Sequence, residues 1–263
     1  MSFLSRLLAP APAPKRRIER DVVALQLADG RCIEVLRVRD ARARRLRASV
    51  DERGVRLTLP ARASAISGER FLHEHRDWIA AQLAQYAAHA PATLVAHATS
   101  TLALRGVEAP VRWSTARTCC FDLADDAAIE ARAPAAPSAA SLARALRDFY
   151  ETQARGDLNR WLPHYLDALP KPPGRMRFKI MASQWGSLAP AGAMALDLSL
   201  VLARPSAFRY VLVHELCHLI HADHSRNFWR EVQARCPDWR LERAYLHTEG
   251  RRLKATLRAL VAG

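Results

Sequence analysis

Two kinds of hydrophobic pattern divide the chain. Between residues 20 and 60, short apolar runs alternate with polar positions, which is typical of half-buried β-strands. One pair of runs flanks Asp29–Gly30 and another flanks residues 52–54, so each pair predicts a β-hairpin. Residues 93–133 have strand-like runs again. The first half of the chain is therefore predicted to be rich in β-structure.

Elsewhere the apolar spacing follows the 3.6-residue period of an amphipathic helix. Residues 67–89 have this spacing with Ser67 as a candidate N-cap, and residues 138–168 have it up to PKPPG, whose prolines cannot continue a helix. In the final third we expect strands at 175–183 and in AMALDL (193–198), then helices at about 206–221, 226–235 and 241–261. These elements predict an α+β fold, with a β-rich N-terminal half packed on a helical C-terminal half.

Length and hydropathy define three regions. The chain has 263 residues, of which 50 % are hydrophobic, enough for one compact body or two closely packed lobes. Residues 1–20 form a Pro/Ala-rich basic segment without the long apolar core of a signal peptide. We expect this segment to be a disordered tail, or alternatively a weak amphipathic membrane contact. We expect residues 21–133 to be a β-rich region with one helix, and residues 134–263 to carry the active centre.

Charge and cysteine content narrow the class of protein. The net charge of +14 would attract nucleic acid, nucleotides or acidic proteins. Most of the basic residues are arginines spread along the whole chain, so we expect such an interaction to be weak. The five cysteines have no regular spacing, which argues against a disulfide framework. No apolar run approaches the ~20 residues that span a bilayer. The prediction is a cytoplasmic protein with reduced thiols.

The candidate metal-binding and catalytic side chains lie in VLVHELCHLIHADHS, residues 211–225. His214 and His218 are four residues apart, so on a helix they share one face and can bind the same metal ion. Glu215 would lie beside the metal and accept a proton from its water, whose pKa zinc lowers to about 7. The apolar neighbours predict a buried helix, where unpaired polar groups cost several kcal/mol. A bound metal ion would explain why histidines and a glutamate occur on a buried helix.

The third protein ligand has several candidates. His221 lies on the same helical face as His214 but ~10 Å further along the axis, so three histidines in line cannot surround one ion. His224 can reach the metal if the helix ends near residue 221 and the chain turns back. We favour His224 on these grounds. A downstream glutamate remains an alternative, the candidates being Glu231, Glu242 and Glu249.

Several segments resemble the YgjP-like metallopeptidase family of zincins, whose site design is related to that of the SprT and WLM zinc proteases. The strongest is YVLVHELCHLIHADHSRNFW at 210–229, supported by SQWGS at 183–187 and PDW at 237–239. The N-terminal segments RARRLRASVDERGVRLTLP and FLHEHRDWI also resemble the family, so the resemblance covers about residues 35–255.

This resemblance implies a zincin-like C-terminal half with an HExxH active-site helix. It also implies that His214, His218 and His224 are zinc ligands and that Glu215 is the general base. The substrate-facing loop departs from the family at Gln184, Leu188 and Asp197, and Asp223 departs before the third histidine. Trp185 and Gly186 are expected to shape the cleft. We expect the AMALDL strand to form the sheet edge on which an extended peptide pairs.

The function predicted from the sequence is zinc-dependent hydrolysis, with a peptide bond in a peptide or protein substrate as the favoured target. One alternative is nucleoside triphosphate pyrophosphohydrolase activity at the same metal site, although no glycine-rich phosphate cradle accompanies it. A second alternative is a DNA-associated zinc protein in which the metal is structural.

Overall fold

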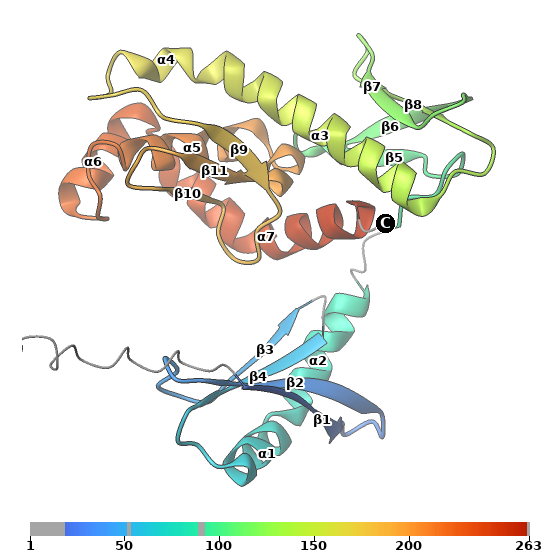
Figure 1. Cartoon of the computed structure of the whole chain (residues 1–263), viewed down its shortest axis with the longest axis vertical. Coiled ribbons are helices and arrows are strands. Elements are labelled where there is room, and N and C mark those ends of the chain that lie inside the picture. Colours follow the sequence, from blue (N-terminus) through green and yellow to red (C-terminus); the bar gives the residue numbers. More distant parts are fainter. Residues whose placement is uncertain (1–18, 52–53, 89–92, 262–263) are drawn as a thin grey trace, which may run out of the picture. The chain divides into compact units, whose positions relative to one another are not determined.

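A computed structural model describes residues 19–51, 54–88 and 93–261 of the chain. Its contacts divide the chain into two compact units, Met1–His89 (unit 1) and Ala90–Gly263 (unit 2) (Figure 1). Each unit has its own hydrophobic core. The boundary predicted at residue 133 falls inside unit 2. Of the predicted tail, residues 1–18 lie outside the described residues, and Glu19 and Arg20 already belong to the first strand.

Unit 1 contains a four-stranded sheet in the order β1-β2-β4-β3. Both predicted hairpins are present, because β1 pairs antiparallel with β2 and β3 pairs antiparallel with β4. Gly30 and Gly54, at the two turns, have φ values of 84° and 101°, which favour glycine. The strands are β1 (Glu19–Gln26), β2 (Cys32–Asp40), β3 (Arg47–Asp51) and β4 (Gly54–Pro60).

Two helices, α1 (Ala65–Glu74) and α2 (Arg76–Ala88), replace the single helix predicted at 67–89. Ser64, rather than Ser67, is the N-cap, because its side chain accepts a hydrogen bond from the Ser67 N–H. The break is at His75, whose N–H bonds back to Phe71 and whose φ of −106° is not helical. Leu72 and Ile79 belong to the same buried cluster as the apolar side chains of the sheet.

Unit 2 begins with a second four-stranded sheet, in the order β5-β6-β8-β7. The helix predicted at 138–168 ends at Trp161, because Pro163 has no N–H and begins the separate short helix α4. Ser138 is the N-cap of the long helix α3 and bonds to the Ser141 N–H. The elements are β5 (Thr101–Leu104), β6 (Val107–Thr115), β7 (Cys120–Leu123), β8 (Ile129–Ala133), α3 (Ala139–Trp161) and α4 (Pro163–Leu166).

A three-stranded sheet in the order β10-β11-β9 completes the β-structure of unit 2. The strands are β9 (Met176–Lys179), β10 (Gly186–Leu188) and β11 (Met194–Asp197). β11 contains most of AMALDL and pairs with both neighbours, so the expectation that this segment forms a sheet edge is wrong. All four residues of β11 are buried, as in a central strand. The strand beside the active-centre helix is instead the edge strand β10.

Helices form the remainder of unit 2. A short 3₁₀ helix, η2 (Leu198–Leu202), leads into α5 (Pro205–Cys217), which contacts α3, α6, α7, η2 and β10 (Figure 1). α6 (Arg226–Arg235) and α7 (Trp239–Val261) complete the chain. The predicted α+β fold class is therefore confirmed. In the part of the chain that the structure describes, no helix is long and apolar enough to cross a membrane.

Candidate metal centre

The centre is built where α5 ends. Its last helical residue is Cys217, four residues before the end predicted from the sequence, and His218 is the C-cap. The carbonyls of the last turn then accept shorter-range bonds, including His218 N–H to Glu215 and Leu219 N–H to Leu216. Such 3₁₀-type closure uses carbonyls that an ending helix would leave unpaired. The chain is thereby free to turn back before α6.

The turn between α5 and α6 places His224. The Asp223 carboxylate accepts a hydrogen bond from the Ser225 N–H at 3.2 Å. The Ser225 hydroxyl in turn accepts the Phe228 N–H and caps α6. The first bond spans His224 and the second fixes the backbone that follows it, so the turn holds His224 in place.

Three imidazole rings meet at this point. The ring centroids of His214, His218 and His224 are 4.8 to 5.1 Å apart. Each ring offers one nitrogen to a set whose members all lie within 4.8 Å of one another. Among the described residues, these three histidines are the one group of His, Cys, Asp and Glu side chains with metal-binding spacing.

The donor set fits a zinc ion. Nε2 of His214 and Nε2 of His224 are 3.1 Å apart. Two nitrogens bound tetrahedrally to one zinc would be about 3.3 Å apart, since each Zn–N bond is about 2.0–2.1 Å. Nδ1 of His218 is 3.1 Å from the carbonyl oxygen of His221, to which it donates if its Nε2 is left for a metal. Nδ1 of His214 is buried and has no partner among the described residues.

The pKa values of the histidines also favour the binding of a metal cation. Burial, followed by the neighbouring imidazoles, lowers the pKa of His214 to about 3. Burial lowers the pKa of His218 as well. Both imidazoles are therefore neutral near pH 7 and retain a lone pair for a metal ion.

Aromatic side chains of α6 support the three rings. The buried Phe228 ring lies 4.6 to 4.9 Å from all three imidazoles and stacks on that of His218. Trp229 lies 5.8 and 5.9 Å from the rings of His214 and His224, and it stacks on Trp239 at 4.3 Å. These contacts limit ring rotation and so preserve the orientation of the nitrogens.

Glu215 lies beside the cluster without joining it. Its side chain is buried, and among the described residues its carboxylate has no hydrogen-bond or ion-pair partner. Burial raises the pKa of Glu215 to about 7. The β10 backbone approaches it closely, since a Cβ added at Gly186 would be 2.6 Å from Glu215 Oε1. A side chain at position 186 would therefore displace the Glu215 carboxylate.

The loop before β10 is fixed by a buried ion pair. Lys254 of α7 lies 2.8 Å from the Asp197 carboxylate and donates to the carbonyls of Met181 and Gln184. Asp197 also accepts the Met181 N–H. The Lys254 ammonium is 4.2 Å from the centre of the Trp185 ring. α7 thus holds the residue that precedes Gly186.

The other ligand candidates are engaged elsewhere. Glu231 pairs with Arg235, Glu242 with Arg204 and Glu249 with Arg252. His221 is outside the metal-spaced group, and its backbone carbonyl rather than its ring faces His218. The geometry therefore brings together the histidines favoured from the sequence and none of the alternatives.

The sequence did not indicate two supporting features. Lys254 is one of four lysines in an arginine-rich chain, and it faces inward from α7. A lysine at an inward position of this otherwise apolar helix face is the sequence feature that could have indicated its role. Gly250 has a similar role, because a Cβ there would be 2.7 Å from the Trp185 ring. Its partner is distant in sequence, so local patterns do not reveal it.

Comparison with protein-family models gives a match. A family model described as "YgjP-like, metallopeptidase domain" matches residues 44–249. The matched range spans most of the chain and includes the three clustered histidines, Glu215 and the β10 loop. No curated protein matches the chain.

Proposed function

The chain belongs to the YgjP-like metallopeptidase family, and from this premise we propose that it is a zinc-dependent peptidase. In this proposal His214, His218 and His224 hold the metal and Glu215 is the general base. One observation carries it: three ring nitrogens converge within 4.8 Å of one another at the end of the helix that also carries a buried carboxylate. Zinc held by three neutral imidazoles would keep its +2 charge and would supply Lewis-acid chemistry for hydrolysis of a peptide bond.

Glu215 moves the proton. With its pKa near 7, the carboxylate can accept a proton at neutral pH, and the resulting acid can donate it to the leaving amine. Its surroundings contribute no competing hydrogen bond among the described residues. The closely packed Gly186 backbone limits where the carboxylate can lie.

The edge strand β10 gives the substrate a place to bind. β10 pairs with β11 only, so the backbone groups on its other side are free within the described sheet. An extended peptide can hydrogen-bond to such an edge as an added strand. Because Gly186 belongs to β10 and contacts Glu215, a peptide bound there would pass beside the proposed base.

A Glu215→Gln variant tests the proposal. We expect the full-length, zinc-loaded protein to hydrolyse a quenched fluorescent casein, and the variant to lose about 10²- to 10⁴-fold in kcat/KM, the usual contribution of a general base. Zinc content, measured by mass spectrometry, should be the same in both proteins. Treatment with 1,10-phenanthroline should abolish activity, and added zinc should restore it.

Nucleoside triphosphates are assayed in parallel. Release of pyrophosphate that disappears in Glu215→Gln, with no casein hydrolysis by either protein, would replace the peptidase proposal by phosphoanhydride hydrolysis. Equal casein hydrolysis by both proteins would contradict the role given to Glu215.

A further inference from the structure

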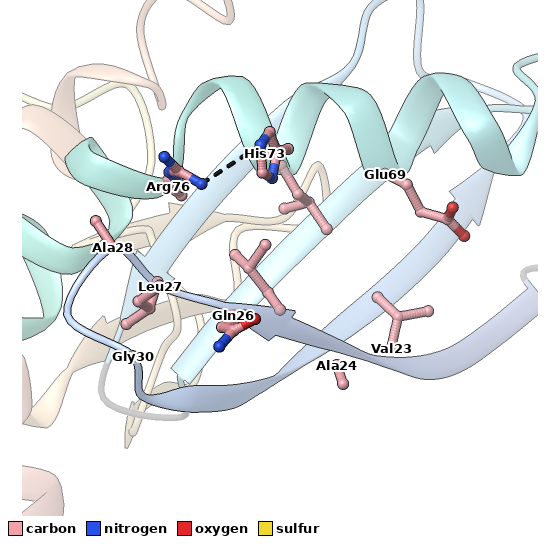
Figure 2. A pocket seen from close by; sticks show the side chains of 11 residues that line it. Val23, Ala24, Gln26, Leu27, Ala28, Gly30, Glu69, His73 and Arg76 are labelled. Carbon is pink, nitrogen blue, oxygen red and sulfur yellow. Dashed lines mark hydrogen bonds between the residues drawn. The ribbon is translucent and has the colours of Figure 1, made fainter.

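Unit 1 contains a groove that the metal centre does not use. Its volume is about 510 Å³ (Figure 2). One wall consists of consecutive residues 23–28, at the end of β1 and in the following turn. The other wall consists of Glu69, Leu72 and His73 of α1 and Arg76, the first residue of α2. The groove thus runs between the first strand of the sheet and one face of a helix.

The strand wall is a free sheet edge. Among the described strands β1 pairs with β2 only. The Leu27 N–H donates to the Arg31 carbonyl at 2.8 Å and therefore points toward β2. Backbone direction alternates along an antiparallel strand, so Val22, Ala24 and Gln26 direct their N–H and C=O groups to the free side. Such an edge can pair with a further strand.

The side chains of the groove combine an apolar floor with charge at its rim. Leu25, Leu27 and Leu72 are buried and form the floor. Arg76 lies over the Ala28 end (Figure 2), with its Nη1 3.4 Å from Nε2 of His73. The Arg76 guanidinium also lies 3.8 Å from the exposed Asp77 carboxylate, and as a cation at the rim it would attract a further acidic group.

The opposite end of the groove carries a carboxylate. Glu69 lies over the Val23 end (Figure 2), and its side chain is largely exposed and 3.8 Å from Arg37. The two ends of the groove therefore differ in charge.

We propose that this groove binds an extended polypeptide segment as an added strand along β1. Its alternate side chains enter between β1 and α1, where an apolar residue contacts Leu25 and Leu72 and an acidic residue lies beside His73 and Arg76. Pairing of this kind takes affinity from main-chain hydrogen bonds and selectivity from alternate side chains. Under the proposed peptidase function, which this role presupposes, the groove holds a segment of the substrate other than the one that is cleaved.

The chain's own N-terminal segment is a weaker candidate for the groove. Residues 1–18 contain Lys15, Arg16 and Arg17 and no Asp or Glu, so they offer no acidic partner to His73 and Arg76. Three prolines at positions 10, 12 and 14 also remove N–H donors that strand pairing uses.

Binding is measured separately from catalysis. The protein is the full-length Glu215→Gln variant, and the probe is a fluorescein-labelled eight-residue peptide in which two valines alternate with two glutamates, so that each face of the extended peptide carries both residue types. We expect saturable binding by fluorescence anisotropy, and binding at least about tenfold weaker, or 1.4 kcal/mol, when lysine replaces glutamate in the probe. Hydrogen exchange should slow at the N–H groups of residues 22, 24 and 26 when the probe binds.

Two variants test the backbone edge and the charge. Ala24→Pro removes one free-side N–H without removing a β1–β2 bond, a position where an edge strand tolerates proline. We expect it to weaken binding about tenfold while circular dichroism and the unfolding midpoint stay unchanged. Arg76→Glu should weaken binding of the glutamate probe and strengthen binding of the lysine probe. Arg70→Glu, the same change on α1 outside the groove, should leave both affinities unchanged.

The outcomes are distinct. If the Ala24→Pro, Arg76→Glu and Arg70→Glu variants all bind the glutamate probe with the same affinity, the groove proposal is overturned. This holds even if casein is hydrolysed and the peptidase proposal stands. Binding that appears only after deletion of residues 1–18 would also overturn it and assign the groove to the chain's own segment. Groove-dependent binding without any peptide hydrolysis would support the groove and count against the peptidase. If the Ala24→Pro variant does not fold, the affinities of the Arg76→Glu variant for the glutamate and lysine probes test the groove proposal instead.

Discussion

At Gly186 the absence of a side chain allows the β10 backbone to touch the Glu215 carboxylate. An added Cβ would lie 2.6 to 2.8 Å from three atoms of that side chain, so Gly186→Ala must displace the proposed base. A misplacement of about 1 Å can cost about 10²-fold in rate, and we expect that loss in kcat/KM with zinc content unchanged. Casein hydrolysis and metal analysis measure the two effects.

Gly156→Ala is the matched control for this substitution. Gly156 is an exposed helical residue of α3, and a Cβ there meets nothing within 4 Å. Alanine should keep full activity and add up to about 1 kcal/mol of stability, because glycine is a poor helix former. Equal activity of Gly186→Ala and Gly156→Ala would show that the contact with Glu215 does not matter.

The third ligand can be identified by a pair of histidine variants. His224→Ala removes a ring from the metal-spaced group, so zinc affinity should fall by more than about 100-fold, the upper end of the loss caused by removing an outer-shell partner. His221→Ala removes a ring outside the group and keeps the carbonyl near His218, so zinc should bind as before. Competition with a chromophoric chelator gives both affinities. The reverse order would assign the third ligand to His221.

For single residues, the sequence predicts the site where the residues concerned are close together in the chain. Spacing along one helix is enough to predict that His214 and His218 share a face, and the length of a helical turn is enough to disfavour His221. Gly186 and Gly250 depend on neighbours distant in the chain, so their close approaches to Glu215 and Trp185 have no local signature.

Among the elements, α5 shows why boundaries are harder to predict than helices. Its apolar wall continues to Ile220, so periodicity extended the predicted helix to residue 221. The structure ends it at Cys217, because 3₁₀-type bonds from residues 218–220 close the last turn. β11 shows a related difficulty, since the sequence of so short a strand does not show whether it pairs with one neighbouring strand or with two.

The Lys254–Asp197 pair joins α7 to the sheet that carries β10. Lys254→Met would leave the Asp197 carboxylate buried without its cation, which typically costs about 3–5 kcal/mol. We expect a loss of about 3 kcal/mol in the free energy of unfolding of unit 2, because Asp197 keeps its bonds to the Met181 and Ser199 N–H groups. Urea titration followed by tryptophan fluorescence measures it.

Lys179→Met makes the same chemical change on β9, at an exposed position. Surface substitutions of this kind usually change stability by less than about 0.5 kcal/mol. Equal unfolding curves for the two lysine variants would contradict a stabilising role for the buried pair. A stability loss without any loss of casein hydrolysis would show that the pair supports the fold and not the position of β10.

For the whole molecule, the proposed catalytic centre and the proposed binding groove belong to different units. The two hydrophobic clusters share no residue, and all three clustered histidines, Glu215 and β10 belong to unit 2. The groove beside β1 belongs to unit 1. The sequence suggested either one body or two lobes, and it placed the boundary after a strand that packs into the core of unit 2.

A fragment of residues 93–263 tests this separation. Its length is within the usual range for an independent domain, and its core is complete without unit 1. We expect it to unfold cooperatively, to bind one zinc per chain and to hydrolyse a short unselective peptide with the kcat/KM of the full chain. It should lose the preference for substrates in which pairs of valines alternate with pairs of glutamates, because the groove that provides this preference is missing.

The comparison of short and long substrates distinguishes a structural role of unit 1 from a binding role. If unit 1 only supported the fold of unit 2, the fragment would lose zinc and activity toward both substrates together. If unit 1 binds the substrate, only KM for the long acidic substrate should rise, while kcat remains unchanged, since the reacting groups are all in unit 2. The Ala24→Pro and Arg76→Glu variants of the full chain should then reproduce the kinetics of the fragment, since they remove the same contacts without removing the unit.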